Sequence, residues 1–114
     1  MRSILVSAPV VLASLDAPGP GGACHDYAIQ YGGPDAVCRV PFQCGPRGEP
    51  GSTPGIFDDA LLAIVEDRLA AFQSGSFACD ENRLAVIAVR EARAAMAARV
   101  ANRMARGVLG MNKT

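Results

Sequence analysis

Hydrophobic residues recur at helical spacing in the second half of the chain. Between Ile56 and Gln73 they follow one another at intervals of four, four and three residues: Leu61, Val65, Leu69 and Phe72. This spacing places the side chains on one face of an amphipathic helix. Asp58 and Asp59 fall in the first turn, where the helix dipole favours negative charge. The pattern predicts a helix over residues 56–73.

A second, longer helix is predicted from Asp80 to about Arg106. The segment "SGS" ends the first helix, Asp80 can cap the second, and Gly107 is a typical C-terminal stop. Five apolar residues lie on one side of this helix: Val86, Val89, Met96, Val100 and Met104. Two more, Leu84 and Ile87, lie on a different side. A two-helix hairpin cannot cover both sides, so this surface predicts a homo-oligomer. The alternative is that the β segment and the leader cover the second side.

The segment before the helices is predicted to be β structure. Residues 25–31 and 36–44 carry β-branched and aromatic residues, and "GGPD" between them has turn chemistry. Pro41 marks an edge strand or a bulge. Residues 45–55 contain too many Gly and Pro residues for regular structure and are predicted to form a loop. The fold class is therefore α+β, with a short N-terminal antiparallel β-hairpin followed by a long antiparallel two-helix hairpin.

The chain opens with an apolar stretch, "MRSILVSAPVVLASLDAPGP". Its early Arg2, apolar run and small residues outline a secretory signal peptide, but Pro9 interrupts the run and Pro18 follows the plausible cleavage site. The run is also too short to cross a bilayer as a helix. We expect a strand-like or poorly ordered extension, with a signal peptide as the alternative. The expected divisions are an extension (1–22) and a domain (23–114) with a β segment (23–45), a loop (46–55), a helical hairpin (56–106) and a tail (107–114).

Composition narrows the classes of partner. The chain has 114 residues, with 11 basic and 11 acidic side chains and no net charge. A balanced charge provides no field that attracts a nucleic acid polymer or a membrane surface. Lys113 is the single lysine, and the other basic residues are arginines. Arginine is the planar, forked cation that suits phosphates and bases.

No arrangement of residues predicts catalysis, a metal or a cofactor. His25 is the only histidine and lies in a predicted strand. We interpret the acidic pairs Asp58–Asp59 and Glu66–Asp67 as capping and solvated helix surface rather than a catalytic dyad. A zinc site at Cys24, His25, Cys38 and Cys44 fits no common module. With Cys79, these cysteines are expected to be reduced thiols.

The arginines of the second helix suggest a binding site. Arg99, Arg103 and Arg106 follow one another by four and three residues, so they share one face of the helix. Three arginines on one face form a local anion site in a neutral protein. The alternative is a solvated surface with salt bridges.

Three segments together resemble a known family. They are "FQCGPRGEPG", "LLAIVEDRLAAFQSGSFACDEN" and "RVANRMARGVLG". In this order they are similar to the helical-hairpin domain of phage Thoeris anti-defence sponges, a hairpin that the related anti-CBASS sponges share. The resemblance covers roughly residues 24–113. Its most specific parts are "FQxGxFACxEN", the preceding "DRL" and the following "RxxxRxxRGVxG".

The resemblance implies a non-enzymatic phage protein in the cytoplasm of the infected bacterium. Such proteins bind immune signals, namely glycocyclic ADP-ribose and cyclic di- or trinucleotides, and keep them from Thoeris or CBASS effectors. They are typically hexamers with pockets between subunits. At the matching positions Phe72 would stack on a base, Asn82 would hydrogen-bond the ligand, and Arg99 and Arg103 would bind phosphates. Arg47 is a further candidate phosphate contact.

Arg106 joins the candidate set because it shares the arginine face of the second helix. Phe77 and Cys79 are interpreted as packing residues.

Two other hypotheses about the function remain. The chain is an oligomeric protein-interaction module or a small inhibitor of a host protein, or its arginines bind RNA or DNA. Zero net charge argues against the last of these.

Overall fold

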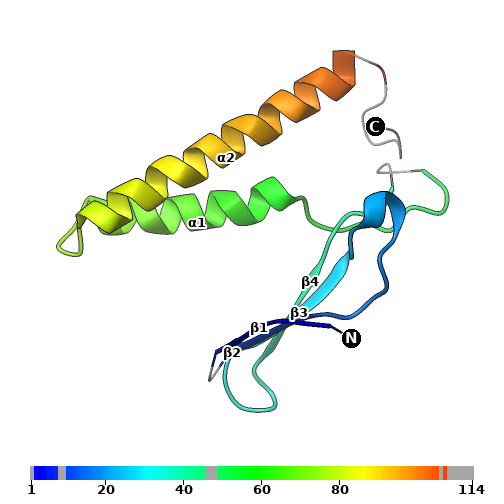
Figure 1. Cartoon of the computed structure of the whole chain (residues 1–114), viewed down its shortest axis with the longest axis horizontal. Helices are drawn as coiled ribbons and strands as arrows, with labels where there is room; N and C mark the ends of the chain where they lie inside the picture. Colours follow the sequence, from blue (N-terminus) through cyan, green and yellow to red (C-terminus); the bar gives the residue numbers. More distant parts are fainter. Residues whose placement is uncertain (1, 8–9, 46–48, 106, 108–114) are drawn as a thin grey trace. The chain divides into compact units, whose positions relative to one another are not determined.

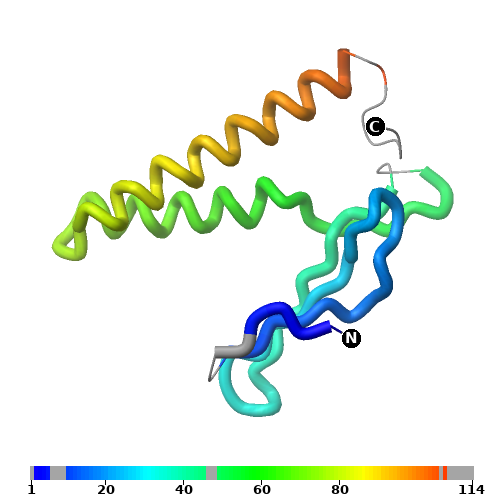
Figure 2. The backbone as a smooth tube through the Cα atoms, viewed as in Figure 1, coloured from blue at the N-terminus to red at the C-terminus, as the bar shows by residue number. Residues whose placement is uncertain are grey.

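The backbone forms a β-sheet unit followed by a helical hairpin, and the division lies between Ile56 and Phe57. The computed structural model describes residues 2–7, 10–45, 49–105 and 107. Figures 1 and 2 trace the strands in the first half of the chain and the two helices in the second half. This order of elements confirms the predicted α+β class.

The sheet has four antiparallel strands in sequential order: β1 (Arg2–Ser7), β2 (Val10–Ser14), β3 (Asp26–Gln30) and β4 (Val37–Pro41). The predicted hairpin of residues 25–44 is β3 and β4. The apolar opening of the chain contributes β1 and β2, which makes the sheet larger than the two strands expected. Its Val- and Leu-rich β2 pairs with β3, and Leu12 lies opposite Ile29. This pairing places apolar residues on adjacent strands, where they stabilise a sheet.

Small side chains and one thiol form the core of the sheet unit. Ala13, Cys24 and Val40 are buried, and Ser14 is fully enclosed.

Pro41 ends β4, which is an edge strand, so the prediction for this proline is confirmed. An edge position tolerates proline because no neighbouring strand needs its missing N–H.

The described residues of the predicted loop, 45 and 49–55, form no helix and no strand of the sheet, as expected. Isolated bridges join Phe42 to Ile56 and Cys44 to Thr53, and they bring the ends of the loop together. Gly55 allows this closure, because a Cβ atom at this position would overlap the backbone of Phe42.

The two helices are α1 (Asp58–Gln73) and α2 (Asp80–Ala105). The predicted stop at Gly107 is confirmed, since this residue has a φ of 70° and its N–H donates to the Met104 carbonyl at 3.1 Å. The expected capping role of Asp80 is wrong. Asp80 is the first helical residue, and the N–H of Asn82 donates instead to the Cys79 thiol at 3.4 Å.

Three of the five residues on the predicted apolar face of α2 pack within the hairpin. Val86 is buried, and Val89 and Met96 are half-buried. Val100 and Met104 are 44% and 62% exposed. The difference follows from helix length, because α2 has 26 residues and α1 has 16, so α2 continues beyond the first turn of α1 (Figure 2).

Ion pairs between the helices stabilise their alignment. Arg93 bonds to Asp59 at 2.8 Å and to Glu66 at 3.0 Å, and Arg90 bonds to Glu66 at 3.4 Å. The Arg93 guanidinium holds the pKa of the Asp59 and Glu66 carboxyl groups below their usual range. Each acidic pair thus contributes one residue to an interhelical contact, which sequence spacing alone did not reveal.

This network predicts a pH dependence of hairpin stability. The folded chain lowers both carboxyl pKa values, so the stabilisation is present above about pH 4.5 and is lost as the pH falls through the lowered values. We expect the melting temperature of the wild type, followed by circular dichroism, to fall more steeply in acid than that of Arg93→Gln. Arg99→Gln, which removes another arginine of α2, should behave as the wild type. Equal slopes for the wild type and Arg93→Gln would contradict the prediction.

Candidate ligand site at the turn of the helical hairpin

The turn between α1 and α2 is held by side-chain hydrogen bonds. The Gln73 Oε1 atom accepts the N–H of Cys79 at 3.2 Å and the Nδ2 group of Asn82 at 3.1 Å. Asn82 Nδ2 also donates to the carbonyl of Leu69 at 2.9 Å. These bonds connect the end of α1 to the start of α2, so the residues around the turn have defined positions.

A shallow pocket of about 270 Å³ opens at this turn. Its walls are Phe72, Phe77, Cys79 and Asn82. The Phe72 and Phe77 rings meet edge to face, with centroids 6.3 Å apart and an interplanar angle of 77°. The structure therefore brings together Phe72 and Asn82, which are the proposed base-binding residues.

Phe77 and Cys79 do not have the packing role expected for them. Phe77 is 75% exposed, and Cys79 is also exposed. Both line the pocket with Phe72, which is itself 39% exposed. An exposed pair of phenylalanine rings at a pocket is an apolar surface that a planar ligand can cover.

Asn82 has a structural role that the sequence did not indicate. Its Nδ2 group is used within the chain by Leu69 and Gln73. The contacts within the described chain use Nδ2 only, so the Oδ1 atom of Asn82 is available to a ligand. A carbonyl oxygen accepts hydrogen bonds, so Asn82 would bind a donor such as an exocyclic amine or a hydroxyl group.

Loss of the Asn82 amide should weaken the turn. We expect Asn82→Ala to lower the free energy of unfolding by about 1–3 kcal/mol, because Leu69 and Gln73 lose the hydrogen bonds from the Asn82 amide. Urea denaturation followed by circular dichroism measures this change. Asn102→Ala is the matched control, since Asn102 is exposed on α2. Equal stability of the two variants would show that the bonds at the turn contribute nothing.

The candidate arginines occupy different environments. Arg99 is exposed and forms no ion pair with the part of the chain that the structure describes. Arg103 is 8% exposed and makes an intramolecular interaction. Arg47 and Arg106 lie outside the described residues. Arg99 is therefore the described member of the arginine face that is accessible to an anion.

The structure separates Arg99 from the pocket. Both Asn82 and Arg99 lie on α2, and at about 1.5 Å per residue they are about 26 Å apart along the helix axis. Arg103 is one turn farther along. The pocket and the arginine face of one chain are therefore too distant to contact one compact cyclic nucleotide together.

Arg68 lies next to the pocket and was not among the candidates. Its guanidinium carbon is 5.5 Å from the centroid of the Phe72 ring. The signal was present in the sequence, because residues four apart on a helix are neighbours and Arg68 precedes Phe72 by one turn.

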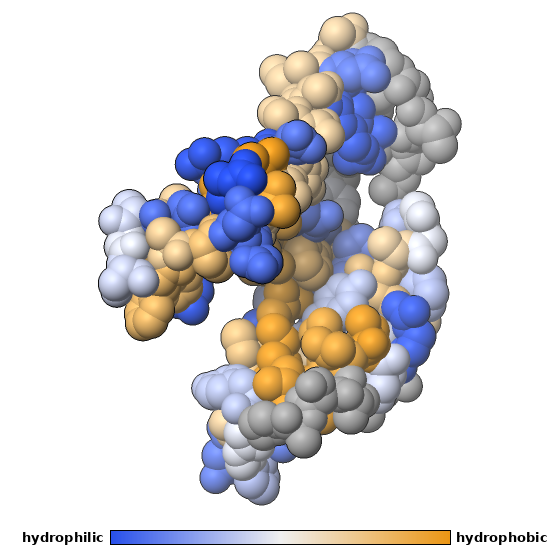
Figure 3. Space-filling view, turned by 60° about the vertical axis from the view of Figure 1, so that its left-hand side comes forward, coloured by the Kyte–Doolittle hydropathy of each residue, from blue (hydrophilic) through white to orange (hydrophobic). Residues whose placement is uncertain are grey.

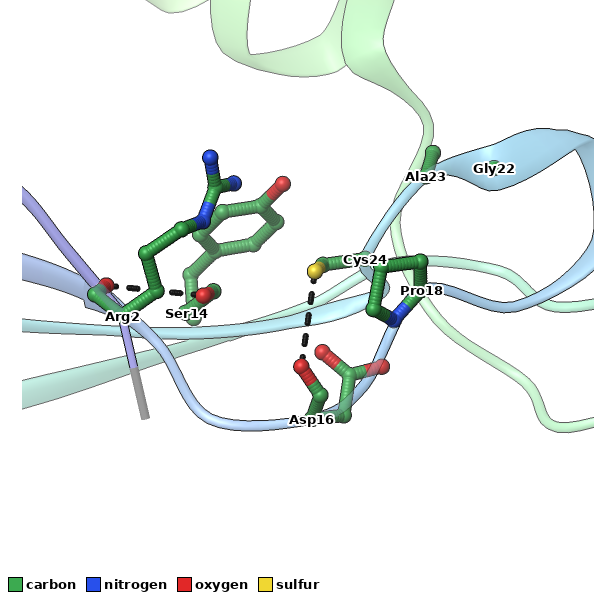
Figure 4. Close-up of a pocket in the computed structure, with 8 residues that line it drawn as sticks. Arg2, Ser14, Asp16, Pro18, Gly22, Ala23 and Cys24 are labelled. Carbon is green, nitrogen blue, oxygen red and sulfur yellow. Dashed lines mark hydrogen bonds between the residues drawn. The ribbon is translucent and has the colours of Figure 1, made fainter.

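A second pocket, of about 400 Å³, lies in the sheet unit. Figure 4 shows the Cys24 thiol directed toward Asp16, and the thiol donates to the Asp16 carbonyl at 3.4 Å. The Asp16 carboxylate accepts the N–H groups of His25 and Asp26, and the bond from His25 lowers the pKa of Asp16. These bonds connect the start and the end of the β2–β3 connection, so Asp16 has a structural role.

Metal and membrane chemistry find no support among the described residues. No group of three or more His, Cys, Asp or Glu side chains in the described ranges is placed to hold a metal ion. The four cysteines are free thiols. No helix in the described part of the chain has the length and hydrophobicity needed to cross a bilayer.

Comparison with known proteins places the hairpin in a family. Residues 34–101 match the model of the Acb2/Tad1 hairpin domain. The chain belongs to the Acb2/Tad1 hairpin family. The match includes β4, α1, the turn and most of α2, so it contains Arg68, Phe72, Asn82 and Arg99. Arg103 and Arg106 lie beyond its end.

A relative of this Acb2/Tad1 hairpin protein comes from a phage. The chain is 39% identical over 77 residues to the protein Thoeris anti-defense 1 of Bacillus phage SBSphiJ7. The aligned residues are 68% of this chain and 54% of the relative, so the chain spans about half the length of the curated relative that it matches.

Proposed function

We propose that this protein is a phage anti-defence protein that sequesters bacterial cyclic nucleotide signals and so blocks Thoeris or CBASS effectors. The observation that carries the proposal is the pocket at the hairpin turn, where the accessible Phe72 ring lies beside Asn82. Membership of the Acb2/Tad1 hairpin family and similarity to Thoeris anti-defense 1 support the same function.

The residues at the turn have the chemistry that a nucleotide requires. An aromatic ring stacks on a base, and an amide oxygen accepts a hydrogen bond from it. Arg99 provides a charge for phosphate. The mechanism is binding alone, without a catalytic step, so a captured ligand leaves the protein chemically unchanged.

The distance between the pocket and Arg99 indicates how a complete site would form. One compact ligand cannot contact both parts of a single chain, so we infer that a second copy supplies the arginines. In this arrangement the pocket of one subunit faces the arginine face of another, and the ligand lies between subunits. Arg47 and Arg106 remain candidate phosphate contacts of this site, together with Arg103.

Exposed apolar residues on the helices support assembly. They lie along both helices: Ile64, Val65, Leu84, Ile87, Val100 and Met104. Figure 3 shows hydrophobic surface exposed beside hydrophilic surface. Exposed apolar surface of this kind marks interfaces. We propose a homo-oligomer, with the hexamer typical of the resembled sponges as the specific form, acting in the cytoplasm of the infected bacterium.

Native mass spectrometry of the full chain tests this function. The protein is exposed to glycocyclic ADP-ribose isomers, cyclic di- and trinucleotides, and linear ADP-ribose as a control. We expect an oligomer that retains cyclic ligands in a fixed ratio to subunits and releases them intact on denaturation. A monomer that retains none of them would overturn the proposal, and a chemically altered ligand would overturn its non-catalytic part.

The exposed apolar residues also favour a second candidate function, that of a protein-interaction module or inhibitor of a host protein. Val100 and Met104 are exposed on the part of α2 that continues beyond α1. A stable oligomer that retains no nucleotide, and that is unchanged in Arg99→Ala and Arg103→Ala, would favour this candidate.

A further inference from the structure

We propose that Arg68 and Phe77 complete the base-binding site, with Arg68 holding the Phe72 ring in place and Phe77 forming a perpendicular wall that selects planar, purine-sized bases. The inference rests on the proposed function and concerns the same pocket. It gives Arg68 a positioning role, exerted through Phe72, and it gives Phe77 a direct contact with the ligand.

The first step concerns the position of Arg68. Its guanidinium group lies 5.5 Å from the Phe72 centroid, within the range of a cation–π contact. Arg68 is exposed and forms no ion pair with a carboxylate of the described chain. By contrast, Arg83, Arg90 and Arg93 each bond to an acidic residue. The aromatic ring is thus the contact that positions Arg68.

The second step concerns the access of a ligand to the Phe72 ring. The pocket is lined by Phe72, Phe77, Cys79 and Asn82, and Arg68 is not part of its wall. Arg68 therefore contacts the Phe72 ring from outside the pocket wall. A base that enters the pocket would stack against Phe72, while Arg68, which is not part of the wall, holds the ring through its own contact.

The third step concerns the charge on Arg68. A guanidinium group close to an aromatic ring attracts its π electrons, which favours stacking of an electron-rich base on that ring. It also limits rotation of the Phe72 side chain, so less ordering is required when the ligand binds. Both effects act only while the Phe72 ring is present.

The fourth step concerns Phe77. This ring is 75% exposed and stands at 77° to Phe72. Two aromatic rings at nearly a right angle form a corner, so a planar base stacked on one ring has its edge against the other. A purine offers a longer edge than a pyrimidine, and the corner thus favours purine-containing signals.

A double-mutant cycle tests the role of Arg68. Affinities of the full chain for a purine cyclic dinucleotide are measured by calorimetry for wild type, Arg68→Gln, Phe72→Leu and the double variant. We expect Arg68→Gln to weaken binding about 2- to 5-fold. In the Phe72→Leu background the same change should have no further effect. Arg83→Gln, which removes an exposed arginine near the turn, is the control for net charge and should bind as the wild type.

Each other outcome contradicts a stated part of the proposal. If Arg68→Gln binds as tightly as the wild type, or if the substitution weakens binding equally with and without Phe72, the positioning role of Arg68 is overturned.

Phe77→Leu should weaken the binding of a purine cyclic dinucleotide about tenfold and should weaken the binding of its pyrimidine counterpart less. Equal losses for the two ligands overturn the role of Phe77. A wild type that binds no ligand overturns the proposed function itself, and this inference with it.

Discussion

A mixture of two weakened variants, Phe72→Leu and Arg99→Gln, is expected to regain high-affinity signal binding that neither variant shows alone. In each pure variant every proposed site lacks either the stacking ring of Phe72 or the phosphate contact of Arg99. When the two chains assemble together at random, about a quarter of the proposed sites should receive Phe72 from one chain and Arg99 from the other, because each proposed site uses two copies of the chain. Calorimetry on co-expressed chains measures the recovered number of sites.

A second mixture is the control for this experiment. Phe72→Leu and Asn82→Ala both alter the pocket within one chain, so their co-assembly should leave every site defective. Recovery in this control would show that the pocket itself is shared between chains. No recovery in the first mixture, with both variants still oligomeric, would show that the pocket and Arg99 do not act on one ligand.

Phe72→Leu alone is expected to reduce affinity for the bound signal about 5- to 150-fold. The reason is the loss of base stacking, which contributes about 1–3 kcal/mol per base. Leucine keeps the side chain apolar, so the change removes the planar face with little effect on the hairpin, of which Phe72 is a partly exposed member. Titration of the wild type and the variant by calorimetry gives the two affinities.

The matched control for this substitution is Phe57→Leu. Phe57 is 55% exposed and lies immediately before α1, at the opposite end of that helix from Phe72. We expect its replacement to leave the affinity unchanged. A similar loss in both variants, or no loss in Phe72→Leu, would exclude stacking on Phe72 as the basis of binding.

The geometry of the turn suits the proposed capture of a ligand. Gln73 and Asn82 connect the two helices through side-chain hydrogen bonds, so the pocket walls are positioned before a ligand arrives. Arg93 aligns the same helices farther along through Asp59 and Glu66. Preorganisation of this kind lowers the entropic cost of binding.

Local sequence signals predicted the secondary structure of the hairpin well. The apolar spacing of Leu61, Val65 and Leu69 indicated α1, and Gly107 indicated the end of α2. Both signals act over one or two helical turns, so they need no knowledge of the rest of the fold. The β3–β4 hairpin was equally local, because a short turn joins its strands.

Contacts between distant residues were not predictable in the same way. The chain opening was expected as an extension, and its pairing with β3 depends on residues that lie about a dozen or more positions apart. Arg93 could have been a solvated arginine, and only the alignment of the helices places it between two carboxylates. Spacing along one helix does not show which side faces the other helix.

For the candidate site, too, the local features were predictable from the sequence and the contacts between distant residues were not. The sequence alone placed Arg99 and Arg103 on one helical face, and its motifs singled out Phe72 and Asn82. The tertiary structure decided which of these residues meet. It joined Phe72 and Asn82 with the exposed Phe77 in one pocket, and it separated Arg99 from them along α2. The periodicity of the sequence determines the direction in which each side chain leaves its helix axis. The packing of two helices at a turn determines which of their faces become neighbours in space.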